Sequence, residues 1–403
     1  MSRPPNKGVR LAVVLSHPTQ YYSPWFRWMR AHTPVQFRVF YLWDFGVTRQ
    51  HDPNFGKSFE WDVDLLSGYD SEIVPNTAAR PGAEHFFGFR NPGLTGRLAA
   101  WKPDAVLLFG YKWASHMRVV AWAASRGIPL IFRGDSHLIG RGRPPLHVRL
   151  ALRVLFSRFA SFLCVGAANR EYFEAFGVPA RKLFVAPHSV NAELFDPEGP
   201  GQRAAAGELR ERLGVRPGAR VILFAGKMVP AKQPAELLEA FLSVNPRDAA
   251  LVFVGDGPER ERLQSMAAAG ASAGGPPVHF LPFANQSEMP ARYLMSDLFV
   301  LPSRGIYETW GLAVNEAMHM GIPCLVSTRV GCQRDLVTHG ATGWVFDPAR
   351  PETLASALSE ALQELSSAPR RDEIRRAVAA RISGYTYRQT TEGLKAALAA
   401  LPA

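Results

Sequence analysis

The chain has 403 residues, of which 47% are hydrophobic and 20% charged, and this composition excludes an intrinsically disordered protein. At roughly 100–200 residues per domain, the length predicts two domains. Three cysteines, none in a Cys-x-x-Cys pair, exclude a disulfide framework and a cysteine-rich zinc site and favour a reducing compartment. No run reaches the roughly 18 apolar residues that span a bilayer, so we expect a cytoplasmic protein.

The net charge of +11 is unevenly distributed along the chain. Residues 1–200 contain 24 Lys and Arg against 15 Asp and Glu, whereas residues 201–403 contain 22 against 20. Within residues 112–158, nine basic residues accompany a single acid, Asp135. Such a segment indicates an anionic partner, either a phospholipid, a phosphorylated carrier or, less expected, a nucleic acid. A solvated basic surface explains it equally well.

Short apolar strands alternate with helical patterns in the first half of the chain. The strands are expected at residues 9–15, 36–42, 105–109, 130–132, 162–165 and 183–186. In sheets of this kind, ligands bind beyond the carboxyl ends of the strands. Polar residues follow two of the strands: His17, Gln20 and Tyr21 come after the first, and Asp135 and His137 come after the fourth.

Residues 146–158 have a basic amphipathic pattern, in which Arg149, Arg153 and Arg158 recur at near-helical spacing. A helix of this kind could lie on an anionic membrane. Its apolar residues exceed one face, however, and this favours a helix that is packed within the domain. We therefore expect a packed helix and keep peripheral membrane contact as the alternative.

A Pro- and Gly-rich stretch at residues 196–202 separates this half from a second series of strands. These are expected at residues 221–224, 251–254, 278–281, 298–301, 324–327 and 344–346. The strands of both series show little polar alternation, which indicates parallel sheets covered by helices on both faces. The sequence therefore predicts an α/β protein with two doubly wound domains.

The loop after the strand at 221–224 carries Gly226, Lys227 and Lys232 and leads into a helix that begins near Pro234. The free N–H groups of a helix start attract anions, and two lysines add full positive charges. A diphosphate suits such a loop. Taken alone, two solvated lysines are the simpler explanation.

Two carboxylates, Glu308 and Glu316, follow the strand at 298–301. Glu316 shares a helical face with Leu312, and Glu308 precedes the expected helix start, so both acids can point into one cleft. The alternative is that Glu308 is a favourable charge near a helix N-terminus and Glu316 is a surface residue.

Five motifs follow one another in the second half: Gly226-Lys227-x4-Lys232, Val254-Gly255-Asp256-Gly257-Pro258, Tyr293-x3-Asp297-x3-Leu301-Pro302-Ser303, Glu308-x7-Glu316-Ala317-Met318-x2-Gly321-x-Pro323 and Gly340-x-Thr342-Gly343. In this order they resemble the retaining glycosyltransferases of family four. The resemblance implies a GT-B fold, with an acceptor-binding Rossmann-like domain over residues 1–195 and a nucleotide-sugar donor domain over 200–383. It also implies a C-terminal helix within 384–403 that crosses back to the first domain.

The resemblance implies roles for individual residues as well. Lys227 and Lys232 would hold the donor diphosphate, Glu308 would contact the sugar hydroxyls, and Glu316 would contact the ribose. The implied donor-binding residues are Gly226, Lys227, Lys232, Gly255, Phe283, Gly311, Leu312 and Glu316. The implied catalytic residues are Glu308, Lys232 and His137. The expected acceptor-binding residues are His17, Gln20, Tyr21 and Asp135.

We therefore expect a retaining transferase that moves a hexose-type sugar from a nucleoside diphosphate to a hydroxyl of a glycan, glycolipid or small molecule. The expected setting is polysaccharide or glycolipid assembly at the inner membrane face. Neither a bound cofactor nor a metal is expected, because lysines and a helix start can neutralise the leaving group. The alternatives are a nucleotide-sugar epimerase of the same fold and a non-catalytic, basic anion-binding protein. A dinucleotide-dependent dehydrogenase is disfavoured because Arg260 stands in place of the third glycine of its motif.

Overall fold

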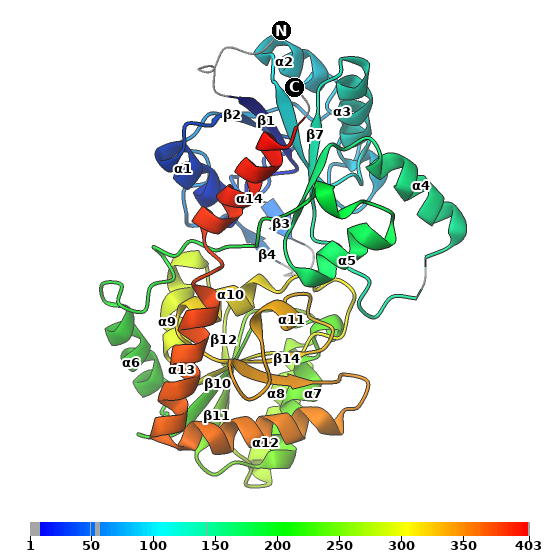
Figure 1. Cartoon of the computed structure of the whole chain (residues 1–403). Coiled ribbons are helices and arrows are strands. Elements are labelled where there is room, and N and C mark those ends of the chain that lie inside the picture. The colour runs from blue at the N-terminus through cyan, green and yellow to red at the C-terminus, as the bar shows by residue number, and fades with distance from the viewer. Residues whose placement is uncertain (1–8, 49, 53–56, 143, 402–403) are drawn as a thin grey trace.

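The computed structural model describes residues 9–48, 50–52, 57–142 and 144–401. The chain forms two α/β domains, and Figure 1 shows the N-terminal one, in blue to green, above the C-terminal one, in green to orange. A parallel sheet lies at the centre of each domain. The predicted fold class, two doubly wound α/β domains, is confirmed.

The N-terminal sheet has seven strands. In sheet order they are β5 (Ser71–Ile73), β2 (Gln36–Tyr41), β1 (Arg10–Leu15), β6 (Ala105–Phe109), β7 (Leu130–Arg133), β8 (Ser161–Cys164) and β9 (Leu183–Val185). The helical segments of this domain are α1 (Tyr22–His32), η1 (Phe86–Gly88), α2 (Leu94–Trp101), α3 (Ala114–Ser125), α4 (Leu146–Phe156), α5 (Ala167–Ala175) and η2 (Ala180–Lys182). A separate antiparallel pair joins β3 (Gln50–Asp52) and β4 (Lys57–Phe59).

The C-terminal sheet has six strands. In sheet order they are β12 (Val278–Leu281), β11 (Ala249–Val254), β10 (Arg220–Ala225), β13 (Leu298–Leu301), β14 (Cys324–Ser327) and β15 (Gly343–Phe346). The helical segments of this half are α6 (Gln202–Arg212), η3 (Pro230–Lys232), α7 (Pro234–Val244), α8 (Arg260–Ser272), η4 (Gln286–Glu288), α9 (Met289–Leu294), α10 (Leu312–His319), α11 (Gln333–Leu336), α12 (Glu352–Ser366), α13 (Ala368–Ile382) and α14 (Tyr387–Ala399).

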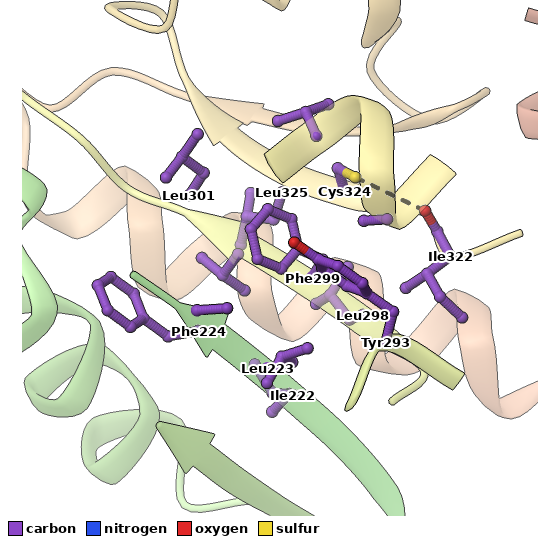
Figure 2. Packing of buried hydrophobic residues seen from close by; sticks show 14 of the residues in the cluster. Ile222, Leu223, Phe224, Tyr293, Leu298, Phe299, Leu301, Ile322, Cys324 and Leu325 are labelled. Carbon is purple, nitrogen blue, oxygen red and sulfur yellow. Dashed lines mark hydrogen bonds between the residues drawn. The ribbon is translucent and has the colours of Figure 1, made fainter. Parts of the chain in front are cut away.

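The strands of the C-terminal sheet are buried on both faces. Leu298, Phe299 and Leu301 of β13 are inaccessible to solvent, and Figure 2 shows them packed between side chains of β10, such as Ile222, and of β14, such as Leu325. A strand buried in this way needs apolar residues at successive positions. This explains why the twelve predicted strands could be recognised as short apolar runs.

All twelve predicted strands are present, with ends that differ from the prediction by at most two residues. Strand β5 was not predicted, because a three-residue edge strand is too short to show a pattern.

The last helix, α14, leaves the C-terminal half and packs on the N-terminal domain. It contacts β8, β9 and α1, and Figure 1 shows it in red beside that domain. Leu394 and Ala397 are buried in the N-terminal core, and Trp25 Nε1 donates a hydrogen bond of 2.9 Å to Thr391 Oγ1. The final segment of the chain is therefore part of the first folding unit in space.

Helix α4 departs from the expectation that its apolar residues are packed. Phe156 is buried, but Leu146, Leu150 and Val154 are 65%, 55% and 62% exposed. The prediction is wrong for these three residues, because the domain covers only one side of the helix.

Candidate active site

A cavity of about 440 Å³ lies between the two domains, beyond the carboxyl ends of both sheets. This volume is within the range of small-molecule sites. Thirteen of the fourteen residues predicted for the site line the cavity. They are His17, Gln20, Tyr21, Asp135, Gly226, Lys227, Lys232, Gly255, Phe283, Glu308, Gly311, Leu312 and Glu316.

Glycines allow the loops after β10 and β11 to approach each other closely. A Cβ atom at Gly255 would lie 2.1 Å from the carbonyl oxygen of Gly226, and the φ angle of Gly255 is +132°. No other residue fits at this position without displacing the neighbouring loop. The loop of Gly226 and Lys227 is thereby held at the cavity wall.

Lys232, in η3, reaches the loop that follows β13. Its Nζ donates a hydrogen bond of 2.8 Å to Oε2 of Glu308, and Ser303 Oγ donates one of 2.9 Å to the same oxygen. The side chains of Lys232 and Glu308 are only 26% and 17% exposed. The structure thus joins the predicted lysine and acid in an ion pair at the cavity wall.

Helix α10 begins at the same wall. Its N-cap is Gly311, with a φ of +99°, and a Cβ atom there would lie 2.8 Å from Cγ1 of Val330. Leu312 and Ala313, in the first turn, line the cavity. Because the first N–H groups of a helix have no partner within it, this start offers hydrogen-bond donors and a partial positive charge to a ligand.

Glu316 lies in α10 and is 3% exposed, which excludes the alternative of a surface residue. Tyr293 Oη donates to one carboxylate oxygen at 2.7 Å and Gln286 Nε2 to the other at 3.4 Å. Tyr21, from the N-terminal domain, also hydrogen-bonds to this carboxylate. Burial raises the pKa of Glu316 to about 6, although the three hydrogen bonds oppose this shift.

Phe283, which is predicted to bind the donor, lies in a loop that Asp256 anchors. Oδ2 of Asp256 accepts a hydrogen bond of 3.0 Å from the backbone N–H of Phe283. Arg260 lies 3.3 Å from the other carboxylate oxygen of Asp256. The glycine-flanked turn thus positions Phe283 at the cavity.

Asp135 is held by a contact across the domain boundary. Thr309 Oγ1 donates to its Oδ2 at 2.8 Å, whereas Arg133, beneath it, donates to the carbonyl of Ala186. Nε2 of His188 lies 3.9 Å from the same oxygen of Asp135. Burial lowers the pKa of His188 well below its usual value, so this ring is neutral at pH 7.

His137, which is predicted to be catalytic, is the one predicted residue outside the cavity wall. Its ring is 1% exposed, and Nδ1 accepts a hydrogen bond of 3.1 Å from the N–H of Ile139. Nε2 then carries the proton and donates to the carbonyl of Glu308 at 3.4 Å. In this arrangement His137 supports the backbone behind Glu308, and its catalytic role stays a prediction.

The N-terminal wall is rich in aromatic rings. The His17 ring lies edge-on to Trp43 and Phe45, with centroid distances of 6.1 and 5.5 Å. Burial lowers the pKa of His17 to about 4, so the ring is uncharged at neutral pH. Apolar ring faces and neutral hydrogen-bonding groups suit a carbohydrate surface.

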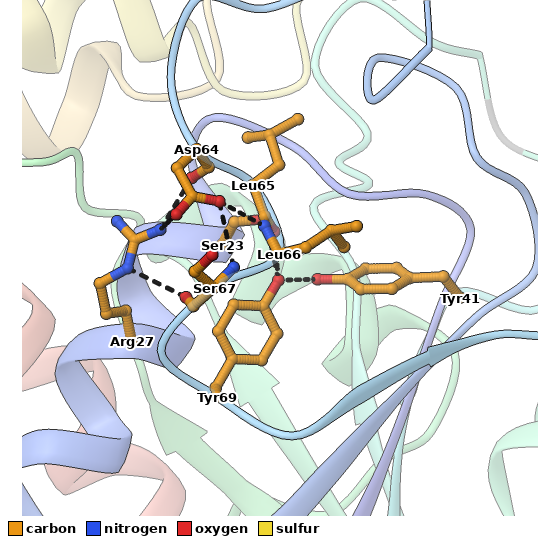
Figure 3. Close-up of polar contacts among 8 residues, drawn as sticks. All are labelled: Ser23, Arg27, Tyr41, Asp64, Leu65, Leu66, Ser67 and Tyr69. Atoms are coloured by element: carbon orange, nitrogen blue, oxygen red, sulfur yellow. Dashed lines mark hydrogen bonds and ion pairs between the residues drawn. The ribbon is translucent and has the colours of Figure 1, made fainter.

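Trp61 also lines the cavity, at the start of a loop that is tied to α1. Figure 3 shows Arg27 donating to the backbone carbonyls of Asp64 and Ser67, while Tyr69 bonds to Tyr41 at 2.6 Å. Backbone N–H groups that donate to Asp64 lower the pKa of its carboxyl group. These contacts fix the loop that carries Trp61.

Four residues that support the site have no role predicted from the sequence: Ser303, Tyr293, Gln286 and Thr309. Ser303 and Tyr293 belong to the five motifs of the C-terminal half, and this position in a motif could have indicated a role in the site. Gln286 and Thr309 are not among the specified residues of these motifs, and each contacts a residue that is distant in the sequence.

Among the described residues, no group of three His, Cys, Asp or Glu side chains is placed to hold a metal ion. No helix in this part of the chain has the length and apolarity needed to cross a bilayer.

The sequence of the C-terminal half matches a known family. Residues 206–379 fit the family described as glycosyl transferases group 1. Over this domain, which is less than half of the chain, the sequence is similar to the group 1 glycosyltransferases. The match supports the resemblance drawn from the five motifs, and neither the epimerase nor the non-catalytic binding protein is favoured.

Curated relatives with named activities are similar to part of the chain. The chain is 33% identical over 242 residues to a D-inositol 3-phosphate glycosyltransferase of Geodermatophilus obscurus, covering 57% of this chain and 50% of the relative. It is 34% identical over 208 residues to a GDP-mannose-dependent alpha-(1-6)-phosphatidylinositol monomannoside mannosyltransferase of Mycobacterium tuberculosis, covering 49% of this chain and 51% of the relative. The match thus spans about half the length of these relatives.

The whole fold of the chain is similar to that of solved structures. Anabaena HepE, in complex with UDP and glucose, superposes with a TM-score of 0.70 at 17% identity, over 98% of this chain and 100% of that one. WaaG, a glycosyltransferase involved in lipopolysaccharide biosynthesis, gives 0.63 at 16% identity, over 98% and 100%. The architecture is therefore GT-B.

Proposed function

We propose that this protein transfers a hexose-type sugar from a nucleoside diphosphate to a hydroxyl group of a glycan or glycolipid, with retention of the anomeric configuration. One observation carries the proposal: Lys227, the Lys232–Glu308 ion pair and the start of α10 line one cavity between the domains. A relative described as GDP-mannose-dependent and a structural neighbour solved with UDP and glucose support a nucleotide-sugar donor.

The main chemical demand is the negative charge that develops on the departing diphosphate. Lys227, Lys232 and the first N–H groups of α10 are the donors that would stabilise it. When a diphosphate enters, Lys232 would share its proton donors between the phosphate and Glu308. Such charge-assisted hydrogen bonds are stronger than neutral ones.

The two acids would orient the donor. Glu308 would accept hydrogen bonds from the sugar hydroxyls, and Glu316, held by Tyr293 and Gln286, would accept them from the ribose. The acceptor hydroxyl would approach from the N-terminal wall and attack the anomeric carbon on the face that the diphosphate leaves. A new carbon–oxygen bond forms as the bond to the diphosphate breaks, and the hydroxyl proton passes to the departing phosphate oxygen. This geometry gives retention.

A thermal-shift panel of UDP-, GDP- and ADP-sugars tests donor binding, because a ligand that binds the folded state raises the melting temperature. We expect one nucleotide class to raise it. Lys232→Ala should weaken that donor by roughly 10- to 100-fold, the effect of losing a charged hydrogen bond. Lys395→Ala, which removes an exposed lysine of α14, is the matched control. No shift with any nucleotide sugar would refute the proposed donor class.

Turnover then separates a transferase from a binding protein. Glu308→Gln should keep the fold, as judged by circular dichroism, but lose most of the release of nucleoside diphosphate. The anomeric configuration of the product, read by NMR, tests retention, and an inverted linkage would contradict it. Donor conversion without any acceptor would instead indicate an epimerase.

A further inference from the structure

Helix α4 carries an exposed apolar stripe with no neighbour in the described part of the chain to cover it. Leu146, Leu150 and Val154 are 65%, 55% and 62% exposed, and their spacing of four residues places them along one side of the helix. Of the eight large hydrophobic residues that are exposed in the described part of the chain, three lie on this one helix. Figure 1 shows α4 projecting from the side of the N-terminal domain.

The opposite side of α4 accounts for its packing. Phe156 is buried, and Leu152 and Leu155 pack against the N-terminal core. These residues therefore hold the helix on the domain, and the exposed stripe makes no contribution to that packing. Exposed aliphatic side chains in a row are costly in water and usually mark an interaction site.

The charge around the stripe indicates what covers it. Arg149 and Arg153 follow Leu146 and Leu150 by three residues, which places them along the edge of the stripe that faces the domain, and the helix contains no acidic residue. Arg153 is exposed, and Arg149, partly exposed, borders a small cavity with Phe176. Among the described residues, no carboxylate forms an ion pair with either arginine. An apolar stripe edged by arginines fits the boundary between the headgroups and acyl chains of an anionic bilayer.

We propose that α4 is an interfacial helix that binds this protein to a membrane surface rich in anionic phospholipid. The stripe of Leu146, Leu150 and Val154 enters the acyl boundary, and Arg149 and Arg153 contact lipid phosphates. The loop between β7 and α4 carries Asp135 at the cavity wall, so the docked surface belongs to the domain proposed to receive the acceptor. The proposal does not depend on which sugar is transferred.

Vesicle cosedimentation with the full chain tests this proposal. The wild-type protein should bind vesicles of phosphatidylcholine with about one third phosphatidylglycerol, and bind pure phosphatidylcholine far less. Leu146→Ser/Leu150→Ser/Val154→Ser should reduce partitioning by about 100-fold, because three aliphatic side chains no longer leave water. Val185→Ser, at another exposed apolar residue, should bind like the wild type.

A second pair of variants tests the charge. Arg149→Gln/Arg153→Gln should lower binding to the anionic vesicles by roughly tenfold or more. Added salt should reduce the difference in binding between the wild type and this variant, because salt screens the charges. Arg375→Gln/Arg376→Gln, at exposed positions of α13, removes the same charge from the other domain and should have little effect. Melting temperatures of all variants should stay close to that of the wild type, since the altered side chains are exposed or, for Arg149, partly exposed.

Two kinds of result would overturn the proposal, one from vesicle binding and one from the oligomeric state. One is the absence of binding to the anionic vesicles by the wild type, or equal binding by the triple serine variant with an unchanged melting temperature. The other is a dimer in sedimentation velocity that the triple serine variant abolishes while neither protein binds lipid, because a second copy of the chain would then cover the stripe.

Discussion

At the scale of single residues, the buried carboxyl group of Glu316 gives stability a dependence on pH. Burial raises its pKa from 4.5 to about 6. Between these values the folded protein holds a proton that the unfolded chain has released. The contribution of Glu316 to the free energy of unfolding therefore falls as pH rises through this window, by on the order of 2 kcal/mol, and is constant above it.

Glu316→Gln isolates this effect, because the amide has nearly the same shape and does not titrate. The stability advantage of the wild type over the variant should be about 2 kcal/mol larger near pH 4 than near pH 7, as measured by urea unfolding. Glu392→Gln, at an exposed carboxylate of α14, should show no such trend. An advantage that is independent of pH would contradict the raised pKa of Glu316.

At the scale of elements, the close approach of the loops after β10 and β11 depends on Gly255. Gly255→Ala places a Cβ atom 2.1 Å from the Gly226 carbonyl oxygen at a φ of +132°. The clash and the strain together should lower the free energy of unfolding by about 3 kcal/mol or more and weaken nucleotide binding. Gly214→Ala, at a φ of +65° with open space around it, should cost only about 1 kcal/mol. Urea unfolding of both variants compares the two costs, and equal losses would show that no clash occurs.

The elements and the site differ in how far the sequence could predict them. Buried parallel strands such as β11 and β13 are apolar throughout, so their positions could be read directly from the chain. The carboxyl ends of these strands then located the residues that line the cavity. Side-chain direction could not be read in this way. His137 follows β7 as predicted, yet its ring turns behind the Glu308 loop because contacts with a distant segment decide its orientation.

Contacts between distant segments also decide which face of α4 is buried. The helical pattern predicted apolar residues on more than one face, and the N-terminal core buries only the face with Phe156. The face that is covered depends on where the neighbouring elements end. The positions of those elements cannot be read from the sequence of α4 alone.

At the scale of the whole molecule, α14 links the two domains, because it follows α13 in the chain and packs against β9 in the N-terminal domain. Gly393 makes this contact possible: a Cβ atom there would lie 2.0 Å from the carbonyl oxygen of Val185. Gly393→Ala should push α14 away from the sheet and expose Leu394. We expect a loss of about 3 kcal/mol and, for a domain of this size, a melting temperature lower by about 6–12 °C.

Scanning calorimetry of Gly393→Ala, with and without the donor nucleotide, shows which of the two domains loses stability. Because α14 supplies side chains to the N-terminal core and the proposed donor site lies on the other domain, Gly393→Ala should lower the unfolding transition of the N-terminal domain. The nucleotide should still raise the transition of the C-terminal domain. Lys395→Ala changes an exposed residue of the same helix and should leave both transitions unchanged. If Gly393→Ala instead lowered both transitions equally, the two domains would unfold as one unit, with α14 as the segment that couples them.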